Sequence, residues 1–370
     1  MSAHASHPGA APAAHRLTVL QSVGEPDDTT NPYIVQLLDA MPEDDVAIRH
    51  FSMRAALFSS YDLFHVHWPE QLARHRIAVA ARLKQACFAL LLARLWLARV
   101  PVVRTLHNVQ PHEQGDAIER LLLRGLDRLT TRRIQINAAG NDAGNEPFNK
   151  AGHAAGKEPG SAAGHAATST DTILHGHYRD WFAHCLVPPH VRGRLLCFGL
   201  IRPYKGVEAL LAAFAGLDDP AATLRIVGNP ANAAMRDTVE AACAADPRAS
   251  ARLEYVSDAV LAREIGQAQC VVLPYRNMLN SGALLLALSL ARPVLVPRSE
   301  ANIALVAEVG ADWVRLYDGE LDAATLAAAL EPRELPRPGR SPDLSRRDWP
   351  VLGRQHHATY LAALAARSRH

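Results

Sequence analysis

The sequence predicts an α/β protein with two doubly wound, Rossmann-like domains that face a cleft. Short apolar runs alternate with longer Ala- and Leu-rich helical patterns along the chain, which is the rhythm of parallel sheets. A length of 370 residues exceeds one ordinary hydrophobic core. The pair Pro188-Pro189 interrupts the alternation near the middle of the chain, so we expect the domain boundary there.

The expected strands follow one another in both halves of the chain. In the first domain they lie at residues 17–21, 46–51, 63–67, 102–106, 134–137 and 172–174. In the second domain they lie at residues 195–198, 224–227, 253–256, 271–273, 294–296 and 313–316. Helical patterns fill most of the spaces between them, so a parallel sheet is expected in each half.

The remaining segments flank or interrupt the two domains, which we place at residues 17–185 and 190–345. Residues 1–16 lack the charged start and apolar core of a signal peptide and are expected to form a disordered tail. Residues 139–167 repeat with a period of twelve and contain one large apolar side chain, so we expect a disordered insertion. Residues 346–370 contain a final helix, which is expected to cross back to the first domain.

Composition narrows the classes of partner and cofactor. A formal net charge of +2 gives no general attraction to nucleic acid, so no nucleic-acid partner is expected. The five cysteines are scattered without Cys-x-x-Cys spacing and are read as reduced core residues. No Asp-x-Asp motif or other metal-ligand pattern is present, and we expect neither a metal nor a cofactor. No run of eighteen apolar residues predicts a membrane span.

The loop that follows the expected strand at 195–198 has the features of an anion site. Gly199 forms the turn, and Arg202 and Lys205 stand at the start of a helical pattern. Backbone N–H groups, the helix dipole and two full charges all favour an anion there. The turn Asn280-Ser281-Gly282 opens a second helix and offers further N–H donors. Together the two sites predict a nucleotide diphosphate, and the alternative is a solvated basic loop beside an ordinary helix cap.

Polar, titratable residues follow three expected strands of the first domain. They are His65, His67 and Glu70, then His107 and Glu113, and then His175, His177 and Asp180. Because ligands bind beyond the carboxyl ends of strands in open α/β sheets, these clusters are expected to border the cleft. Strand periodicity places His65 and His67 on one face. A zinc site would need further ligands, and the alternative is histidines packed within the sheet.

Residues 77–100 form an apolar helical pattern with basic residues along it. Two interpretations stay open for this helix. It can lie in the headgroup region of an anionic membrane, or it can be a core helix with a basic outer edge.

The sequence resembles the GT-B class of nucleotide-sugar glycosyltransferases. Within that class it resembles the β-mannosyltransferases of exopolysaccharide assembly, through the joint occurrence of FHVHWPE, VVRTLHNVQPHE, DTILHGHYRDWF, FGLIRPYKGVE, RIVGNP, VVLPYRNMLNSGALLLALSLARPVL and DLSRRDWP. The resemblance runs from about Leu17 to Tyr360, apart from the repeat at 139–167.

The resemblance implies what each domain binds. The second domain would hold GDP-mannose through Gly199, Arg202, Lys205, Gly228, Asn229, Asn280, Ser281, Gly282 and Glu300. The first domain would hold a polyprenyl-diphosphate-linked oligosaccharide, with His67, His175, His177 and Asp180 as acceptor-side candidates. Such an acceptor implies a peripheral protein on an anionic membrane surface, at the cytoplasmic face of the bacterial inner membrane.

One departure from the class bears on mechanism. The Glu-x7-Glu pair of the large retaining families is absent from the stretch Met278 to Leu286, so an inverting, metal-independent transfer is expected. For the base that deprotonates the acceptor hydroxyl we expect Glu70, then Glu113, then His107. Glu300 can replace a missing ribose contact or be a solvated loop residue. The rival functions are a nucleotide-sugar epimerase or hydrolase on the same fold, and a non-catalytic binding or scaffold subunit.

Overall fold

The computed structural model describes residues 16–107, 115–137, 169–275, 282–331 and 340–367. The expected tail at 1–16, except its last residue, and the expected insertion at 139–167 lie outside the described residues. Glu113, Asn280 and Ser281 lie outside them as well.

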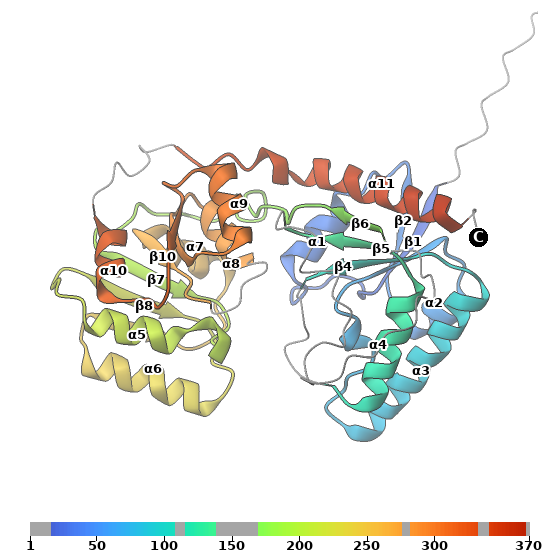
Figure 1. Cartoon of the computed structure of the whole chain (residues 1–370), viewed down its shortest axis with the longest axis horizontal. Helices are drawn as coiled ribbons and strands as arrows, with labels where there is room; N and C mark the ends of the chain where they lie inside the picture. The colour runs from blue at the N-terminus through green and yellow to red at the C-terminus, as the bar shows by residue number, and fades with distance from the viewer. Residues whose placement is uncertain (1–15, 108–114, 138–168, 276–281, 332–339, 368–370) are drawn as a thin grey trace, which may run out of the picture.

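Two six-stranded parallel sheets form the frame of the protein (Figure 1). The first has the order β2-β1-β3-β4-β5-β6, with β1 Leu17–Gln21, β2 Val46–Arg49, β3 Leu63–Val66, β4 Val102–Leu106, β5 Thr130–Gln135 and β6 Ser169–Thr172. The second has the order β12-β11-β10-β7-β8-β9, with β7 Arg194–Phe198, β8 Thr223–Val227, β9 Ala249–Arg252, β10 Cys270–Val272, β11 Val294–Pro297 and β12 Val314–Tyr317. The predicted architecture of two doubly wound α/β halves is confirmed.

Helices cover both faces of each sheet. Around the first sheet they are α1 Pro32–Asp39, α2 Met53–Phe58, α3 Ala78–Leu97, α4 Ala117–Leu129 and α11 Trp349–Arg367. Around the second they are α5 Val207–Ala215, α6 Ala233–Ala245, α7 Asp258–Gln267, α8 Gly282–Ser289, α9 Glu300–Val309 and α10 Ala323–Leu330.

The hydrophobic core of each half is split by its sheet. In β1, Val19 is fully buried against the α1 and α11 side, and the next residue, Leu20, is fully buried against the α3 and α4 side. In β7, Leu195 and Leu196 divide in the same way between the α5 and α8 sides. This burial of both faces explains why the strands are apolar runs rather than alternating ones.

The final helix returns to the first sheet, as predicted. Figure 1 shows α11 lying along one side of that sheet together with α1. Trp349, Leu352 and Tyr360 belong to the same buried cluster as Tyr33 of α1 and Val19 of β1. The last helix of the chain therefore completes the core of the first half.

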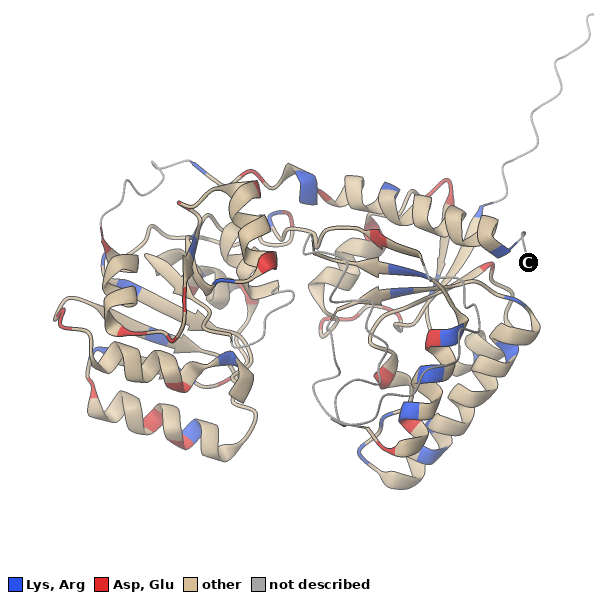
Figure 2. Cartoon of the chain, in the orientation of Figure 1, with Lys and Arg blue, Asp and Glu red and all other residues tan. Residues whose placement is uncertain are grey.

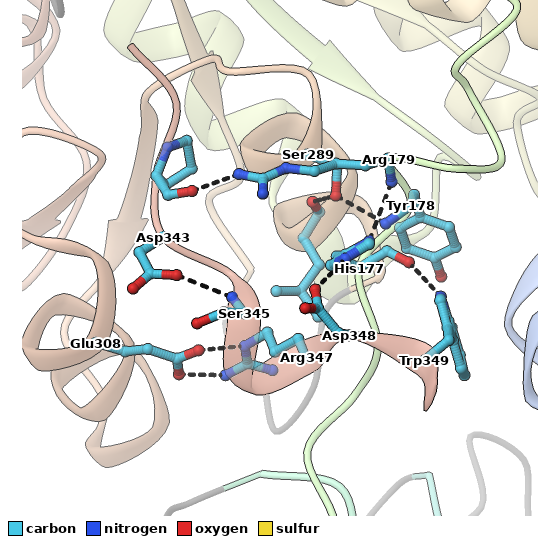
Figure 3. Close-up of polar contacts among 12 residues, drawn as sticks. His177, Tyr178, Arg179, Ser289, Glu308, Asp343, Ser345, Arg347, Asp348 and Trp349 are labelled. Carbon is cyan, nitrogen blue, oxygen red and sulfur yellow. Dashed lines mark hydrogen bonds and ion pairs between the residues drawn. The ribbon is translucent and has the colours of Figure 1, made fainter. Parts of the chain in front are cut away.

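Two segments cross between the halves, and they are bonded to each other (Figure 3). The Asp348 carboxylate accepts a hydrogen bond from His177 Nε2 at 2.8 Å, and Trp349 Nε1 donates to the His177 carbonyl at 2.7 Å. Arg347 forms two hydrogen bonds with Glu308 of α9, at 2.8 and 2.7 Å. The crossing at 174–182 and the crossing at 343–349 thus form one junction.

One predicted strand is wrong and two are displaced. Residues 253–256 form no strand, and β9 lies just before them at Ala249–Arg252. This strand is at the edge of the sheet and pairs through its backbone with β8, so its Ala and Ser side chains gave no apolar signal. Leu253 instead packs against the core from the following loop. Strands β5 and β6 begin four and three residues earlier than expected, at Thr130 and Ser169.

We predict that Gly353→Ala loosens α11 from the first sheet. Alanine is normally the better helix residue by about 0.8–1.0 kcal/mol. Here, however, a Cβ at position 353 would stand 1.8 Å from the Ala40 carbonyl oxygen, so the helix would have to move. The melting temperature should fall, because overpacking of this kind costs about 1–3 kcal/mol. Arg354→Ala, at an exposed position of the same helix, is the control and should leave it unchanged; a higher melting temperature for Gly353→Ala would contradict the close contact.

Candidate active site

The strand orders create one crevice in each sheet where a ligand can enter. In the first sheet the chain runs outward from the neighbours β1 and β3 in opposite directions, and in the second it does so from β7 and β10. Ligands of open α/β sheets bind beyond the carboxyl ends of strands at such points. His65 and His67 follow β3, and the loop with Arg202 and Lys205 follows β7, so both predicted sites lie at these crevices.

Two glycines bring the loops after β7 and β8 into contact. Gly199 has a φ of 98°, and a Cβ at Gly228 would stand 1.9 Å from the Gly199 carbonyl oxygen. The Asn229 carbonyl accepts a hydrogen bond from the Ile201 N–H at 3.0 Å. Position 199 needs glycine because of its positive φ, and position 228 needs glycine because the two backbones approach so closely there. Gly199, Gly228 and Asn229 therefore shape the loop that is predicted to bind the donor.

Lys205 places a positive charge at this crevice. Its Nζ lies 5.1 Å from the centre of the Tyr275 ring, which follows β10. Desolvation lowers the pKa of Lys205, and the nearby charge of Arg202 acts in the same direction. Among the described residues no carboxylate forms an ion pair with either cation. A bound anion would supply that missing counter-charge.

The other donor-side candidates start helices at the same edge of the sheet. Gly282 is the first residue of α8, and Glu300 is the exposed first residue of α9. The structure does not bring Glu300 into contact with Lys205 or Arg202 through any hydrogen bond or ion pair between described residues.

The first-sheet site is a group of buried, neutral histidines. His65 Nδ1 lies 2.8 Å from the Tyr360 hydroxyl and its Nε2 lies 2.8 Å from the Thr105 hydroxyl, so both ring nitrogens are occupied. His67 Nδ1 lies 3.0 Å from His107 Nε2. Burial lowers the pKa of His67 to about 3 and also lowers the pKa values of His65 and His107.

This group is suited to uncharged hydroxyls rather than to phosphate. His67 Nε2 is buried, and within the described parts of the chain nothing accepts or donates a hydrogen bond to it. Buried polar atoms are normally bonded, so this nitrogen is available to a ligand. The predicted packing of His65 and His67 on one face is confirmed by a ring separation of 4.2 Å.

Trp68 borders the histidines, and Glu70 follows it by two residues. Trp68 stacks on His107 with ring centres 4.0 Å apart, and its φ of 43° is a left-handed conformation that is unusual for an aromatic residue. Such strain gathers at ligand sites. Glu70 follows in the short 3₁₀ helix Pro69–Leu72, and its half-buried carboxylate has no hydrogen bond or ion pair to any described residue.

The acceptor-side candidates on the first crossing separate into different environments. His177 is bonded to Asp348 in the junction, and Asp180 is exposed. His175 lies between the halves instead, with its ring centre 4.6 Å from that of Tyr33. Tyr33 in turn lies 5.4 Å from His107, so a chain of rings links the histidines to the second half.

Four aromatic residues of this site were not among the predicted site residues. Tyr33, Trp68, Tyr178 and Tyr275 line it or support its charged groups. Trp68, Tyr178 and Tyr275 lie within FHVHWPE, DTILHGHYRDWF and VVLPYRNMLNSGALLLALSLARPVL, the motifs that carry the resemblance, so their positions there could have identified them. Among the described residues no group of three or more His, Cys, Asp or Glu side chains could hold a metal ion.

Comparison with known proteins identifies the family. Residues 192–331 match the model of glycosyl transferases group 1. The chain is 55% identical over 366 residues, covering 98% of both chains, to a GDP-mannose:glycolipid 4-beta-D-mannosyltransferase of Xanthomonas campestris pv. campestris. The chain belongs to this glycosyltransferase family.

Solved structures share the fold of this glycosyltransferase. Anabaena HepE in complex with UDP and glucose has a TM-score of 0.56 and 14% identity, with 96% of this chain and 98% of that one covered. The α,α-trehalose-phosphate synthase of Burkholderia vietnamiensis has a TM-score of 0.62 and 14% identity, with coverage of 95% and 100%. The expected GT-B architecture is confirmed.

We predict that Lys205→Ala and Arg202→Ala each weaken donor binding about tenfold to a hundredfold. A charge-assisted contact is worth about 1.5–3 kcal/mol, and both cations lie at the crevice without an ion pair to any carboxylate of the described residues. Titration calorimetry with GDP-mannose measures the loss. Arg263→Ala, an exposed change on α7, is the control. Unchanged affinity in both loop variants would show that the diphosphate does not bind at this loop.

Proposed function

We propose that this glycosyltransferase moves mannose from GDP-mannose to a polyprenyl-diphosphate-linked oligosaccharide, with inversion at the anomeric carbon and without a metal ion. The observation that carries the proposal is the half-buried Lys205 at the crevice of the second sheet, which has no carboxylate partner among the described residues. The name of the Xanthomonas relative supports the donor, the glycolipid acceptor and a β product.

The donor's diphosphate would bind at the second sheet. Arg202, Lys205 and the start of α8 would offset the negative charge that develops as the bond to the sugar breaks. The contact of Lys205 with the Tyr275 ring holds the ammonium group in a partly desolvated position, where its charge acts more strongly than in water.

The base would come from the first sheet, on the opposite face of the sugar. Of the three predicted bases, Glu70 is half-buried and has no hydrogen bond or ion pair to any residue that the structure describes. His107 shares its Nε2 with His67, which makes that nitrogen less available to an acceptor hydroxyl. Glu113 lies outside the described residues. We therefore keep Glu70 as the first choice.

We predict that Glu70→Gln lowers kcat about 10²- to 10⁴-fold and leaves donor affinity unchanged, because a well-placed base contributes that much and does not touch the diphosphate. Transfer from labelled GDP-mannose to a detergent-solubilised lipid-linked acceptor measures kcat, and calorimetry measures affinity. Glu43→Gln, an exposed change elsewhere in the first half, is the control. If Glu70→Gln retains full turnover, Glu113 and then His107 become the bases to test.

The helix α3 is the proposed contact with an anionic membrane at the cytoplasmic face of the inner membrane. No helix among the described residues is long and apolar enough to span a bilayer. One side of α3 is core, with Phe88, Leu91 and Leu95 buried. Its opposite side exposes an apolar stripe at i, i+4, i+11 and i+18, formed by Val79, Leu83, Leu90 and Leu97. A helix that is apolar on both sides fits a second apolar surface.

Basic residues surround this stripe, but not all are free to bind lipid. Figure 2 shows Lys and Arg positions recurring along α3 and α4. Arg74 is bonded to Glu119, and Arg94 donates to the Ala56 and Ser59 carbonyls and to Tyr61, so these two stabilise the fold. Arg76 and Arg82 are exposed and are the better candidates for headgroup contacts. Arg82 also forms an exposed ion pair with Asp116 at 2.9 Å and donates to Gln85, and an exposed pair of this kind contributes little to stability.

We predict that Leu83→Gln with Leu90→Gln, and separately Arg76→Gln with Arg82→Gln, release the protein from anionic vesicles. Each basic residue near an anionic surface contributes about 1 kcal/mol, and each buried CH₂ about 0.8 kcal/mol. Vesicle sedimentation measures binding, which should also weaken with salt.

The control for the vesicle experiment is Arg236→Gln with Arg263→Gln in the second half. Melting temperatures should change little, because the changed residues of α3 and its approach are exposed and the only ion pair removed among described residues, Arg82–Asp116, is an exposed one that contributes little to stability. Undiminished vesicle binding by both test variants would contradict the proposal. A change in oligomeric state on replacing the leucines would assign the stripe to a second copy of the chain.

A further inference from the structure

Two largely buried side chains on the crossing at 174–182 each carry a polar atom that has no hydrogen-bond partner among the described residues. His175 and Tyr178 are each 7% exposed. Neither the Tyr178 hydroxyl nor His175 Nε2 forms a hydrogen bond with any residue that the structure describes. Both atoms reach the first residue of α8, since a Cβ at Gly282 would stand 3.1 Å from the hydroxyl and 3.9 Å from Nε2. The Tyr178 hydroxyl and His175 Nε2 therefore lie beside the positive end of the α8 helix dipole.

The protonation of these two groups follows from their surroundings. His175 Nδ1–H donates to the Gly176 carbonyl at 2.8 Å, so in the neutral ring Nε2 carries the lone pair. Burial lowers the pKa of His175 to about 4, and burial raises the pKa of Tyr178. At neutral pH the empty protein thus presents one hydroxyl donor and one nitrogen that can gain a proton.

We propose that His175 and Tyr178 bind the donor's diphosphate at the start of α8, and that His175 takes up a proton as the donor binds. The inference rests on the proposed function, and it adds that the binding of the donor is coupled to protonation of His175. The Tyr178 hydroxyl donates to a diphosphate oxygen. The anion favours the charged imidazole, which then donates from Nε2 to the same group.

The position of His175 assigns it to the leaving group rather than to the acceptor. In an inverting transfer the acceptor oxygen attacks from the face opposite the departing diphosphate, so the base and the diphosphate site lie on opposite sides of the sugar. His175 Nε2 is beside α8 of the second half, whereas Glu70 follows β3 of the first. The two side chains therefore serve opposite faces.

The groups that face His175 leave room for a bound anion to control its charge. Among the described residues, the titratable groups around it are Tyr33 of α1, Tyr178 of its own segment, His107 after β4 and Arg347 of the second crossing. Burial keeps the two tyrosines and His107 neutral. The charge of Arg347 opposes protonation of His175. None of the four provides a negative charge, so a diphosphate would.

Calorimetry with GDP-mannose in the absence of acceptor tests this inference. Binding at about pH 6.5 is measured in two buffers of different ionisation enthalpy, which reports the protons taken up. GDP-mannose is preferred to GDP because a terminal phosphate itself titrates at about pH 6. Wild-type protein should take up a proton, and its affinity should rise as the pH falls from neutral toward the pKa of the free His175.

Three variants identify the source of the proton. His175→Gln should bind GDP-mannose about tenfold to a hundredfold more weakly, without proton uptake and with an affinity that no longer depends on pH. Tyr178→Phe should weaken binding but retain the uptake. His184→Gln, which changes an exposed histidine just after the same crossing, is the matched control and should behave as wild type.

The outcomes separate this inference from the proposed function. The role of His175 would be overturned if GDP-mannose bound without proton uptake, or if the uptake persisted in His175→Gln. The proposed donor would still stand in either case. Binding of UDP-glucose instead of GDP-mannose, with an uptake that His175→Gln abolishes, would overturn the proposed donor and support the role of His175.

Discussion

The position of the two sheets relative to each other depends on the junction of the two crossings. Arg347 and Glu308 form a two-bond ion pair in which both side chains are less than a tenth exposed. Removing one member of such a pair costs about 3–5 kcal/mol, because the other charge is left buried without a partner. Arg347 also donates to the His175 carbonyl at 3.0 Å. The ion pair that joins the second crossing to α9 therefore also holds the backbone of a residue between the two crevices.

The two crevices differ in charge, and the proposed function assigns the donor and the acceptor to them on this difference. The second sheet presents Lys205 and Arg202, and no carboxylate of the described residues forms an ion pair with either. The first presents histidines that burial keeps neutral. Protonated histidines there would draw the diphosphate toward the wrong sheet. Neutral rings can bind sugar hydroxyls as donors and acceptors without competing for the anion.

Much of the fold was predictable because parallel sheets buried on both faces leave a strong local signal. The alternation of apolar runs and helical patterns gave both sheets and the returning α11, and strand periodicity gave the shared face of His65 and His67. The edge strand β9 was not predicted, because its backbone pairing with β8 needs no apolar side chain. The hydrogen-bond partners of Arg74 and Arg94 could not be predicted for another reason. Both arginines are basic residues beside an apolar helix in sequence, and only the tertiary contacts with Glu119 and the α2 carbonyls reveal their structural role.

The site was less predictable than the fold for the same reason. Loop residues such as Gly199 and Lys205 could be found because a strand end and a helix start define an anion site locally. Tyr33 could not, since it lies in an ordinary helical pattern of α1 and reaches His107 and His175 only through packing of distant segments. A residue that connects two sites through tertiary packing cannot be predicted from the sequence pattern around either site.

The chain also brings the proposed base close in sequence to the proposed membrane contact. Glu70 lies in the 3₁₀ helix Pro69–Leu72, which packs against α3, and the exposed stripe of α3 begins at Val79. Arg74 lies between them and is held by Glu119 of α4, so this connection is bonded to the helix pair that carries the stripe. An acceptor sugar on a lipid carrier has to reach the base while its lipid stays in the membrane. The proposed base and the proposed docking helix are joined by few residues with an ion pair between them, and this arrangement would meet that requirement without a spanning helix among the described residues.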